Sequence, residues 1–436
     1  MRYPVYPEYK ESGVQWLGPV PERWPVKSAR FDYAIQLGKM LQPEATSPFD
    51  QETPYFKAQH VQWESVMTND LPTMWASLSD RSKYRVCDGD LLVCEGGEVG
   101  RSAIVHNPPD IAIIQNALHC VRSQNADLRY LMFVLKHAAS QNWLEILCNR
   151  STIAHFTREK FGALQIPSPP LPEQAAIANF LDRETGRIDT LVAKKRRLIA
   201  LLKEKRTVLI SRTVTRGVPA SVAREFGLEP YTRFKDSGIE WLGQVPEGWE
   251  VKKLRFLCTI ETGDKDTINA EDDGSYPFFV RSQTVEWIST YTKNCEGVLT
   301  AGDGVGVGKV FHYVNGKFDF HQRVYLFSNF KGIRGKFFFL YLKEFFWCVA
   351  FDGGAKSTVD SLRRPMIANF PVVVPTETEQ TAIATYLDRE TAKIDRLGEK
   401  IELLISRLQE YRAALITAAV TGKIDVRSCT SQEVST

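Results

Sequence analysis

The sequence predicts an α+β protein built from two similar halves. Each half is a globule of mixed α/β structure followed by one long helix, and the two helices form an intramolecular coiled coil. Three observations support this prediction. Landmarks of the first half recur in order in the second. Valine, isoleucine, aromatic residues and glycine turns fill the middle of each half, which is typical of short strands. Long apolar heptad patterns close both halves.

The composition is that of a soluble globular protein. The chain has 436 residues, a length sufficient for two or three domains. Of these residues 43% are hydrophobic and 25% are charged. The net charge of +3 is too small to indicate nucleic-acid binding by itself. The first residues lack the apolar core of a signal peptide, and no apolar run reaches the ~18 residues of a membrane span. We therefore expect no membrane association and a cytoplasmic location. The eight cysteines form no CxxC pair, so we expect a reduced protein without a metal site.

The repeat is clearest at the two ends of each half. The segment YKESGVQWLGPVPERWPVKSARF at 9–31 returns as FKDSGIEWLGQVPEGWEVKKLRF within 233–256, and LDRET at 181–185 returns at 387–391. Between these ends the two halves differ, and only short landmarks match. They pair Gly89-Asp90 with Gly302-Asp303, Gly100-Arg101 with Gly308-Lys309, and Gln115-Asn116 with His321-Gln322. Shared ends and different middles indicate one scaffold with two different binding domains. An old duplication without a functional division is the alternative.

Strands are predicted in GDLLVCEGG, SAIVH and IAIIQNALHCVR of the first middle, and in VLTAGDG, KVFHYV and FDFHQRVYLF of the second. Apolar helices are predicted at 128–147 and 335–351. Each half then closes with a heptad seam. The first seam contains Ile177, Leu181, Glu184, Ile188, Leu191, Lys195, Leu198, Leu202, Lys205 and Leu209. The second contains Ile383, Leu387, Glu390, Ile394, Leu397, Ile401, Leu404, Leu408, Tyr411 and Leu415. A helix over 172–215 would be ~66 Å long. The unlike seams favour pairing with each other.

These patterns divide the chain into six parts. We expect a first domain at 1–170, a long helix at 171–215, a linker at 216–232, a second domain at 233–375, a second long helix at 376–422, and a polar, disordered tail at 423–436. Gly217, Pro219, Gly227 and Pro230 break the helical pattern in the linker.

Each segment that resembles a catalytic motif lacks a residue that the motif requires. Asn107-Pro108-Pro109-Asp110 resembles the NPP motif of amino-methyltransferases, but Asp110 stands where an aromatic residue stacks on the flipped base. Residues 301–309 resemble a phosphate loop, but Asp303 replaces the first glycine and Val310 the Ser/Thr. No HExxH, GxSxG or His/Cys cluster occurs. We expect no catalytic residue and no cofactor bound by this chain.

Taken together, these features resemble the DNA specificity subunits of type I restriction–modification enzymes over nearly the whole chain. SGVQWLGPVPERW and SGIEWLGQVPEGW resemble the start segments of that family. PLPEQAAIANFLDRETGRID and TETEQTAIATYLDRETAKID resemble its conserved-region helices, and ISRTVTRG and ITAAVTGKID resemble the ends of those helices. The glycine landmarks resemble those of its target-recognition domains. One departure concerns the start of the second helix, where Thr376-Glu377 replaces Pro170-Leu171.

The resemblance implies a pseudo-twofold arrangement of two target-recognition domains joined by two antiparallel helices. Each domain would bind one half of a bipartite site in double-stranded DNA. The helices would set the spacing and dock two methyltransferase subunits, and restriction subunits with motor and nuclease activity would join them. S-adenosylmethionine and adenine chemistry would belong to the methyltransferase partners. The LDRET residues are candidates for subunit docking or helix packing: Leu181, Asp182, Arg183, Glu184, Leu387, Asp388, Arg389 and Glu390.

Residues for DNA reading follow from base-edge chemistry. Arginine pairs best with guanine, and glutamine or asparagine with adenine, while a glycine next to a cation suits close approach to a phosphate. The candidates in the first half are Gln59, His60, Gly100, Arg101, Gln115 and Asn116. Those in the second half are Arg281, Gln283, Gly308, Lys309, His321, Gln322 and Arg323. Ordinary strand turns and polar caps are the alternatives.

Two further cationic segments have open interpretations. Arg150-Ser151-Thr152 and Lys356-Ser357-Thr358 suit either a phosphate or a helix cap. The basic run at 194–216 suits DNA, an acidic partner or a solvated helix face. Two other classes of function also stay open, a stand-alone DNA-binding protein and an orphan DNA methyltransferase.

Overall fold

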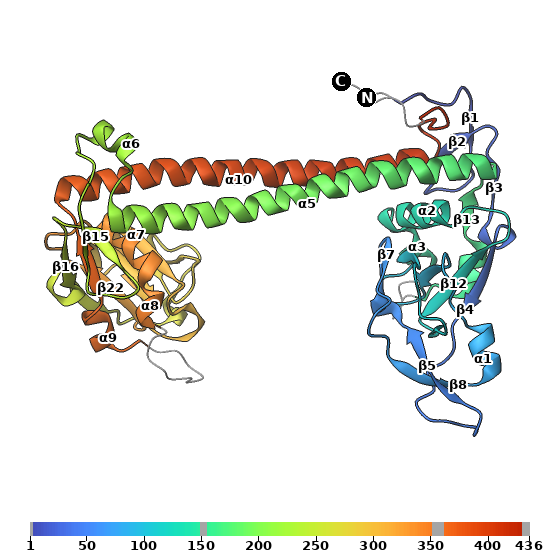
Figure 1. Ribbon diagram of the computed structural model, residues 1–436, viewed down its shortest axis with the longest axis horizontal. Coiled ribbons are helices and arrows are strands. Elements are labelled where there is room, and N and C mark those ends of the chain that lie inside the picture. The colour runs from blue at the N-terminus through green and yellow to red at the C-terminus, as the bar shows by residue number, and fades with distance from the viewer. Residues whose placement is uncertain (1–2, 149–154, 351–361, 430–436) are drawn as a thin grey trace. The chain divides into compact units, whose positions relative to one another are not determined.

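The computed structural model describes residues 3–148, 155–350 and 362–429 (Figure 1). The chain forms two compact units, of which the first combines Met1–Lys194 with Leu403–Thr436 and the second is Lys195–Glu402. The segments Arg150-Ser151-Thr152 and Lys356-Ser357-Thr358 lie outside the described residues. Mixed α/β content and two long helices bear out the coarse fold prediction.

The first unit contains a four-stranded antiparallel sheet, in the order β10-β9-β12-β4, and a three-stranded sheet, β11-β5-β8, in which β11 runs parallel to β5. Three pairs of short strands complete it: β1-β2, β3-β13 and β6-β7. The strands are β1 (Tyr9–Glu11), β2 (Pro19–Pro21), β3 (Val26–Ser28), β4 (Tyr33–Leu37), β5 (Gln51–Phe56), β6 (Val61–Gln62), β7 (Ser65–Val66), β8 (Thr73–Ala76), β9 (Leu91–Cys94), β10 (Ser102–Ile104), β11 (Ile113–Ile114), β12 (Leu118–Ser123) and β13 (Gln165–Pro167). All of β9 is buried, which explains its unbroken apolar run.

The second unit contains a six-stranded sheet in the order β17-β22-β20-β21-β18-β19, with β18 parallel to β21. The pairs β14-β15 and β16-β23 flank it. The strands are β14 (Phe234–Asp236), β15 (Gln244–Pro246), β16 (Glu250–Lys253), β17 (Thr259–Thr262), β18 (Tyr276–Phe279), β19 (Glu286–Ile288), β20 (Lys293–Ala301), β21 (Phe311–Phe320), β22 (Val324–Ser328) and β23 (Pro371–Val374). The strands predicted in both middles are confirmed.

The helices are α1 (Leu78–Lys83), α2 (Leu128–Ser140), α3 (Trp143–Leu147), α4 (Arg158–Ala163), α5 (Leu171–Arg216), α6 (Ala220–Ala223), α7 (Gly335–Phe345), α8 (Trp347–Ala350), α9 (Arg364–Ala368) and α10 (Glu377–Val420). Short 3-10 turns include Ala29–Phe31, Ala58–His60, Arg224–Phe226, Leu254–Phe256, Thr267–Asn269 and Gly304–Gly306. The apolar helices expected in the two middles are confirmed as α2 with α3 and α7 with α8. The segment 301–309, which resembles a phosphate loop in sequence, contains one of the 3-10 turns.

Each long helix contributes to both units. In the first unit the start of α5, with Ile177 and Leu181, shares a core with α2 and with the end of α10 at Leu415 and Val420. In the second unit the start of α10, with Ile383, shares a core with α7 and with the end of α5. The large buried cores explain why short, weakly amphipathic strands are stable here, since burying an apolar side chain contributes about 1.5–3 kcal/mol.

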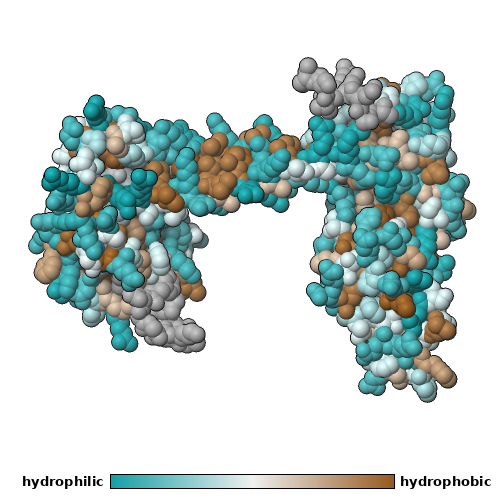
Figure 2. All heavy atoms as spheres, in the orientation of Figure 1, coloured by the Kyte–Doolittle hydropathy of each residue, from teal (hydrophilic) through white to brown (hydrophobic). Residues whose placement is uncertain are grey.

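The predicted heptad seam is only partly buried. Leu181, Ile188, Leu387 and Ile401 are buried, as a coiled coil requires. By contrast, Leu191, Leu198, Leu397 and Leu404 are each between 41% and 46% exposed. Figure 2 shows brown apolar surface along the middle of these helices. An uninterrupted buried seam was therefore the wrong expectation for these four positions and for Tyr411, which is 48% exposed.

The start of α10 matches the start of α5 despite the different residues there. Glu377 begins α10 at the position that Leu171 occupies in α5. Thr376 replaces Pro170 and forms a capping box with Glu379, in which its hydroxyl and N–H both donate to the carboxylate at 2.8 Å. The two helices therefore begin alike through different cap chemistry.

The segment after α10 is packed, which corrects the expectation of a disordered tail for residues 423–429. Val426 is buried in the core of the first unit, and the Asp425 N–H donates to the carbonyl of Pro4 at 2.8 Å. The burial of one valine and the backbone hydrogen bond explain why this polar segment is held.

One predicted pairing of the halves is wrong. Gly89-Asp90 precedes β9, whereas Gly302-Asp303 follows β20, and the register shows that β9 and β20 correspond. The true counterpart of Gly302 is Glu95. The Glu95 N–H donates to the carbonyl of Ala117 at 2.9 Å. In the same way, the Gly302 N–H donates to the carbonyl of Arg323 at 2.8 Å. The Gly-Asp dipeptide is common in turns, and here it occurs at opposite ends of the matching strands.

Two features are absent from the described residues. None of the helices there is long and apolar enough to cross a membrane. Over the same residues, no group of three or more His, Cys, Asp or Glu side chains is arranged to hold a metal ion.

Candidate nucleic-acid interface

The same backbone corner occurs in both units, where a parallel strand pair ends. The Gln115 N–H donates to the carbonyl of Phe56, and the His321 N–H to that of Phe279, both at 2.9 Å. The next residue in each case donates to a lysine carbonyl: Asn116 to Lys39 at 2.9 Å and Gln322 to Lys265 at 2.8 Å. The two units thus hold different side chains on one backbone frame. We call these the first and second corners.

A glycine makes each corner possible. A Cβ on Gly38 would collide with the carbonyl oxygen of Gln115, and a Cβ on Gly263 with that of Phe320. Because these obstacles are backbone atoms, they cannot rotate away as a side chain could. Glycine is therefore required by close backbone approach.

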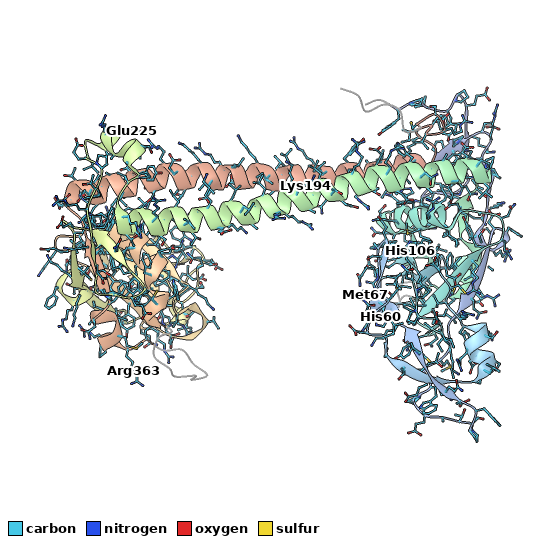
Figure 3. All side chains as sticks on the ribbon, viewed as in Figure 1. His60, Met67, His106, Lys194, Glu225 and Arg363 are labelled. Atoms are coloured by element: carbon cyan, nitrogen blue, oxygen red, sulfur yellow. The ribbon has the colours of Figure 1, made fainter. Side chains whose placement is uncertain are left out.

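In the first corner, amides are the accessible groups. Gln59 is exposed, and Gln115 and Asn116 are half-buried. His60 is buried, and its Nδ1 accepts the Lys57 N–H at 3.2 Å, so it holds the loop rather than facing solvent. Figure 3 shows His60 beside Met67, whose N–H donates to the His60 carbonyl at 2.8 Å. Burial, and secondarily Lys57, lowers the pKa of His60.

The glycine–cation landmarks match in backbone but differ in side chain. Gly100 and Gly308 both have positive φ, at 78° and 67°. Arg101 is held inside the first unit, because its guanidinium donates to the Ala58 carbonyl at 2.9 Å and pairs with Glu98 at 3.1 Å. Lys309 is exposed. Of the two cations, only Lys309 points its charge into solvent.

In the second corner, two arginines converge on one buried carboxylate. Arg281 lies 3.1 Å and Arg323 2.5 Å from Asp303, while both guanidinium groups stay about half exposed. Burial acts to raise the pKa of Asp303, but the hydrogen bonds from Arg323 and Arg281 outweigh it and hold that pKa below its usual range. Asp303 therefore stays ionised and fixes two cationic forks at the surface.

The other second-corner candidates surround this pair. The Gln322 amide donates to Asp266 at 2.8 Å, and the exposed Gln283 donates to the Phe311 carbonyl at 3.4 Å. His321 is buried, and its Nδ1 accepts the Arg323 N–H at 2.9 Å. Sequence reasoning missed Asp303 and Asp266 as partners. Asp303 was visible only as part of a turn landmark, and Asp266 carried no signal.

The LDRET residues are largely engaged within their own units. Asp182 pairs with Arg129 of α2 at 2.9 Å, and Asp388 pairs with Lys336 of α7 at 3.2 Å. Their neighbours Arg183 and Arg389 hold the segments that follow the long helices, through the Cys429 carbonyl at 3.3 Å and Glu225 at 3.0 Å. Arg183 and Arg389 also pair with Glu184 and Glu390. Leu181 and Leu387 are buried.

The glutamate of the Glu-Gln pair near the start of each long helix also has a structural role. Glu173 accepts from the Trp24 ring nitrogen at 3.1 Å, and Glu379 from that of Trp249 at 3.3 Å. The matched ends of the two halves thus form the same tryptophan–glutamate contact in both units.

The fold and its paired corners define a protein with two α/β domains built on the same backbone frame. The chain matches the family described as type I restriction modification DNA specificity domain over residues 51–199 and 246–405. It therefore belongs to that family.

Two curated relatives are similar to this chain in sequence. The chain is 30% identical over 182 residues to the type I restriction enzyme EcoDI specificity subunit of Escherichia coli, which is 42% of this chain and 40% of that protein's length. It is 24% identical to the type I restriction enzyme MjaVIII specificity subunit of Methanocaldococcus jannaschii, over 69% of this chain and 71% of the relative.

Two solved structures share the fold. A chain from a type I restriction–modification system, studied for complex assembly and conformational transition, has a TM-score of 0.67 at 17% identity and covers 92% of this chain and 98% of its own. The HsdS subunit from Thermoanaerobacter tengcongensis has a TM-score of 0.56 at 16% identity, over 95% of this chain and all of its own.

Proposed function

We propose that this chain is the DNA sequence-specificity subunit of a type I restriction–modification enzyme, and that each unit binds one half of a bipartite site in double-stranded DNA. Family membership supports this role. The observation that carries the division of labour is the pair of corners, because one backbone frame presents different side chains in the two units. A scaffold used twice with different contact groups suits two different base sequences.

The side chains suggest which bases each unit prefers. Glutamine and asparagine amides bind adenine through two hydrogen bonds, and arginine does the same with guanine. The first corner offers Gln59, Gln115 and Asn116, and the second offers Arg281, Arg323 and Gln322. We infer an adenine-containing first half-site and a guanine-containing second one. His60 and Arg101 contribute by holding the loops.

The long helices are proposed as an antiparallel spacer that sets the distance between half-sites and docks two methyltransferase subunits. The exposed leucines support docking: on α5, Leu191 and Leu198 are one heptad apart, and on α10 so are Leu397 and Leu404. These positions match between the halves, so two copies of one partner helix can bind in the same way. An apolar stripe at heptad spacing is what such a helix requires.

The chemistry is proposed to lie with the partners. Methyltransferase subunits bring S-adenosylmethionine, restriction subunits bring the motor and nuclease, and this chain is non-catalytic and acts with them in the cytoplasm. The division into domains at 1–170 and 233–375, helices at 171–215 and 376–422, and a linker at 216–232 is proposed as the functional layout, with residues 423–429 belonging to the first unit.

The test is a genome-wide map of methylated adenines in the source cell, with the gene intact, deleted, or carrying a single substitution. Deletion is expected to erase one bipartite motif. Gln115→Ala is expected to relax one half of that motif, and Arg323→Ala the other half. Removing one pair of hydrogen bonds to a base edge costs about 1–3 kcal/mol of discrimination. Arg233→Ala, an exposed change outside both corners, serves as the control.

Persistence of every motif after deletion would contradict the proposal. If both substitutions relaxed the same half, the assignment of one half-site to each unit would fail. Binding of S-adenosylmethionine by the purified chain would favour an orphan methyltransferase. Failure to co-purify any methyltransferase would favour a stand-alone DNA-binding protein.

A further inference from the structure

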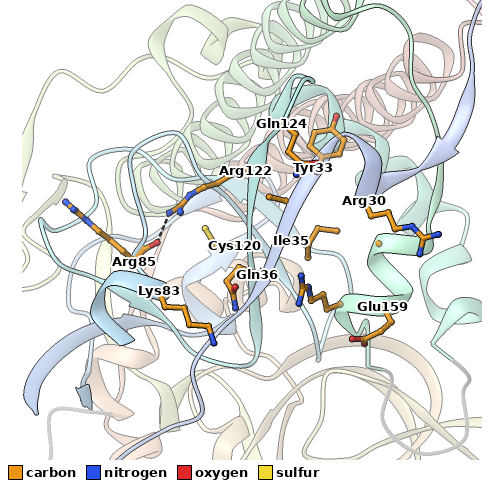
Figure 4. A pocket seen from close by; sticks show the side chains of 13 residues that line it. Arg30, Tyr33, Ile35, Gln36, Lys83, Arg85, Cys120, Arg122, Gln124 and Glu159 are labelled. Carbon is orange, nitrogen blue, oxygen red and sulfur yellow. Dashed lines mark hydrogen bonds between the residues drawn. The ribbon is translucent and has the colours of Figure 1, made fainter. Parts of the chain in front are cut away.

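A groove of about 610 Å³ lies in the first unit, beside the edge strand β4 (Figure 4). Its lining includes five exposed cations and one acid, Glu159. The cations are Arg30, Lys83, Arg85, Arg122 and Arg158. We call this the basic groove. None of its residues was among the sequence-predicted DNA contacts.

Among the described residues, most of this positive charge has no ion-pair partner. In the part of the chain that the structure describes, Arg122 is the only one of the five with an ion pair, to Asp90 at 2.7 Å. Arg85 donates to the neutral carbonyl of Asp110 at 3.1 Å, and Arg30 and Lys83 lie over the rings of Phe31 and Tyr84. A groove with unpaired cations is electrostatically suited to a polyanion.

The second unit provides an internal comparison, because the strand registers align residue by residue. Gln36 pairs with Cys120 across β4 and β12, as Glu261 pairs with Leu326 across β17 and β22. Arg122 lies opposite Ala34 across the first pair of strands, and Ser328 lies opposite Thr259 across the second. By the same register, Arg122 therefore corresponds to Ser328. The second unit therefore has a carboxylate in place of Gln36 and a neutral hydroxyl in place of Arg122.

Two cations of the groove, Arg30 and Arg158, have counterparts of the same charge in the second unit. Arg255 corresponds to Arg30 and donates to the Asn369 side chain at 3.0 Å. Arg364 corresponds to Arg158 and donates to the Ile260 carbonyl at 3.2 Å. Glu261 is neutralised by Lys293 at 2.7 Å. The excess of positive charge in the first unit therefore rests on Gln36 and Arg122, whose counterparts in the second unit are Glu261 and Ser328.

Strand β4 leads directly from this groove to the first corner. Gln36 lines the groove, and Lys39, three residues later, bonds to Asn116 of the corner. Three extended residues span ~10 Å. Three base pairs of duplex DNA also rise ~10 Å. A duplex whose bases met the corner would therefore carry its backbone past the groove.

We propose that the basic groove binds the sugar–phosphate backbone of duplex DNA next to the half-site that the first corner reads. This inference rests on the proposed function and names a site for it. The labelled cations are spread along the groove, from Arg85 and Arg122 on one side to Arg30 on the other, which suits successive phosphates better than one small anion.

The test compares the salt dependence of DNA binding by the full chain, purified with any methyltransferase subunits that accompany it. The probe is a duplex carrying the mapped motif, with a scrambled duplex beside it. The variant combines Arg30→Gln, Lys83→Gln, Arg85→Gln and Arg158→Gln, and spares Arg122 because Asp90 is buried. The control removes the same charge from exposed positions of the second unit: Arg233→Gln, Lys235→Gln, Lys253→Gln and Arg255→Gln. Thermal melting confirms that both variants fold.

The slope of log affinity against log salt is expected to fall by about 0.9 for each phosphate that the variant no longer neutralises, equally on both duplexes, while the base preference stays. A groove variant with the slope of the wild type or of the control overturns the inference. Loss of a partner subunit at unchanged slope also overturns it and identifies a protein-docking face. Failure of the proposed function shows separately, as equal affinity of the wild type for motif and scrambled duplex.

Discussion

The guanidinium of Arg412 lies against the carboxylate of Asp189, with Nε and Nη2 at 2.9 and 3.0 Å from its two oxygens. Its counterpart in the second unit is Arg206 with Asp395, at 3.0 and 3.4 Å. The surroundings differ, because Arg412 also binds Glu64 at 2.5 Å, and Glu64 is paired with Lys136 of α2. Each unit thus joins its two helix segments by one arginine, and among the described residues the first unit adds the loop that carries Glu64 to this network.

Arg412→Ala is expected to destabilise the first unit by about 2 kcal/mol, because the largely buried Glu64 loses a charged hydrogen bond. Arg206→Ala is expected to cost the second unit under ~1 kcal/mol, because Asp395 is half exposed. Hydrogen exchange of the amides in α2 and α7 measures each unit separately. Equal decreases of protection in the two variants would show that the network adds nothing.

Gly38→Ala and Gly263→Ala are both expected to destabilise their units by about 1–3 kcal/mol, because the added methyl group overlaps a backbone carbonyl. Gly186→Ala is the matched control, since its Cβ meets open space on α5 and the change should stabilise the helix by about 0.5–1 kcal/mol. Denaturant unfolding measures all three. A neutral effect at Gly38 would contradict the close approach that forms the first corner.

The buried His137 should make stability depend on pH. Burial, followed by Lys423, lowers its pKa to about 4, whereas an unfolded histidine titrates near ~6.5. Between those values the unfolded chain binds a proton that the folded chain does not, so the free energy of unfolding falls as pH falls through this window. Relative to its value above pH ~6.5, the free energy of unfolding is lower by about 3 kcal/mol at pH ~4.

His137→Gln is expected to flatten that part of the stability profile, while His106→Gln, at an exposed site, should leave it unchanged. Urea unfolding at intervals from pH 7 to 4 gives the profile. A wild-type curve that does not fall between pH 6.5 and 4 would rule out a neutral, buried imidazole.

Leu198→Asp and Leu404→Asp test the docking stripe. Both side chains are more than two-fifths exposed, so stability should change by under ~0.5 kcal/mol apart from the helix propensity that any aspartate loses. Co-purification of methyltransferase subunits is expected to fall sharply. Ala200→Asp, an exposed change on the same helix, should leave it intact. Undiminished association in both leucine variants would place docking elsewhere.

The elements were predictable where a local pattern determines them. The apolar run of β9 and the helix α2 follow from hydrophobic periodicity, and the ends of α5 and α10 follow from a repeated sequence. The exposed leucines were not predictable, because a heptad seam looks the same whether its partner is in the same chain or in another. The order of residues also could not show that Val426 fills the core of the first unit.

The candidate site was less accessible to sequence reasoning. Matching polar dipeptides located both corners, because Gln115 and His321 stand at equal distances from the repeated helix starts. The convergence of Arg281 and Arg323 on Asp303 depends on a fold that brings together separate strands, and nothing local signals it. The basic groove was missed for the same reason, since its cations come from 3-10 turn, strand and helix segments far apart in the chain.

The first unit contains Leu415 and Val420 of α10 in its core, whereas the second unit is one continuous stretch, Lys195–Glu402. During synthesis at 5–20 residues per second, roughly 10 to 40 seconds separate the two parts of the first unit. The second unit can fold as it leaves the ribosome. The first unit cannot complete its core around Trp24 and α2 until the end of α10 has been synthesised. A nascent chain interrupted between residues 402 and 415 therefore contains all of the second unit but lacks part of the first.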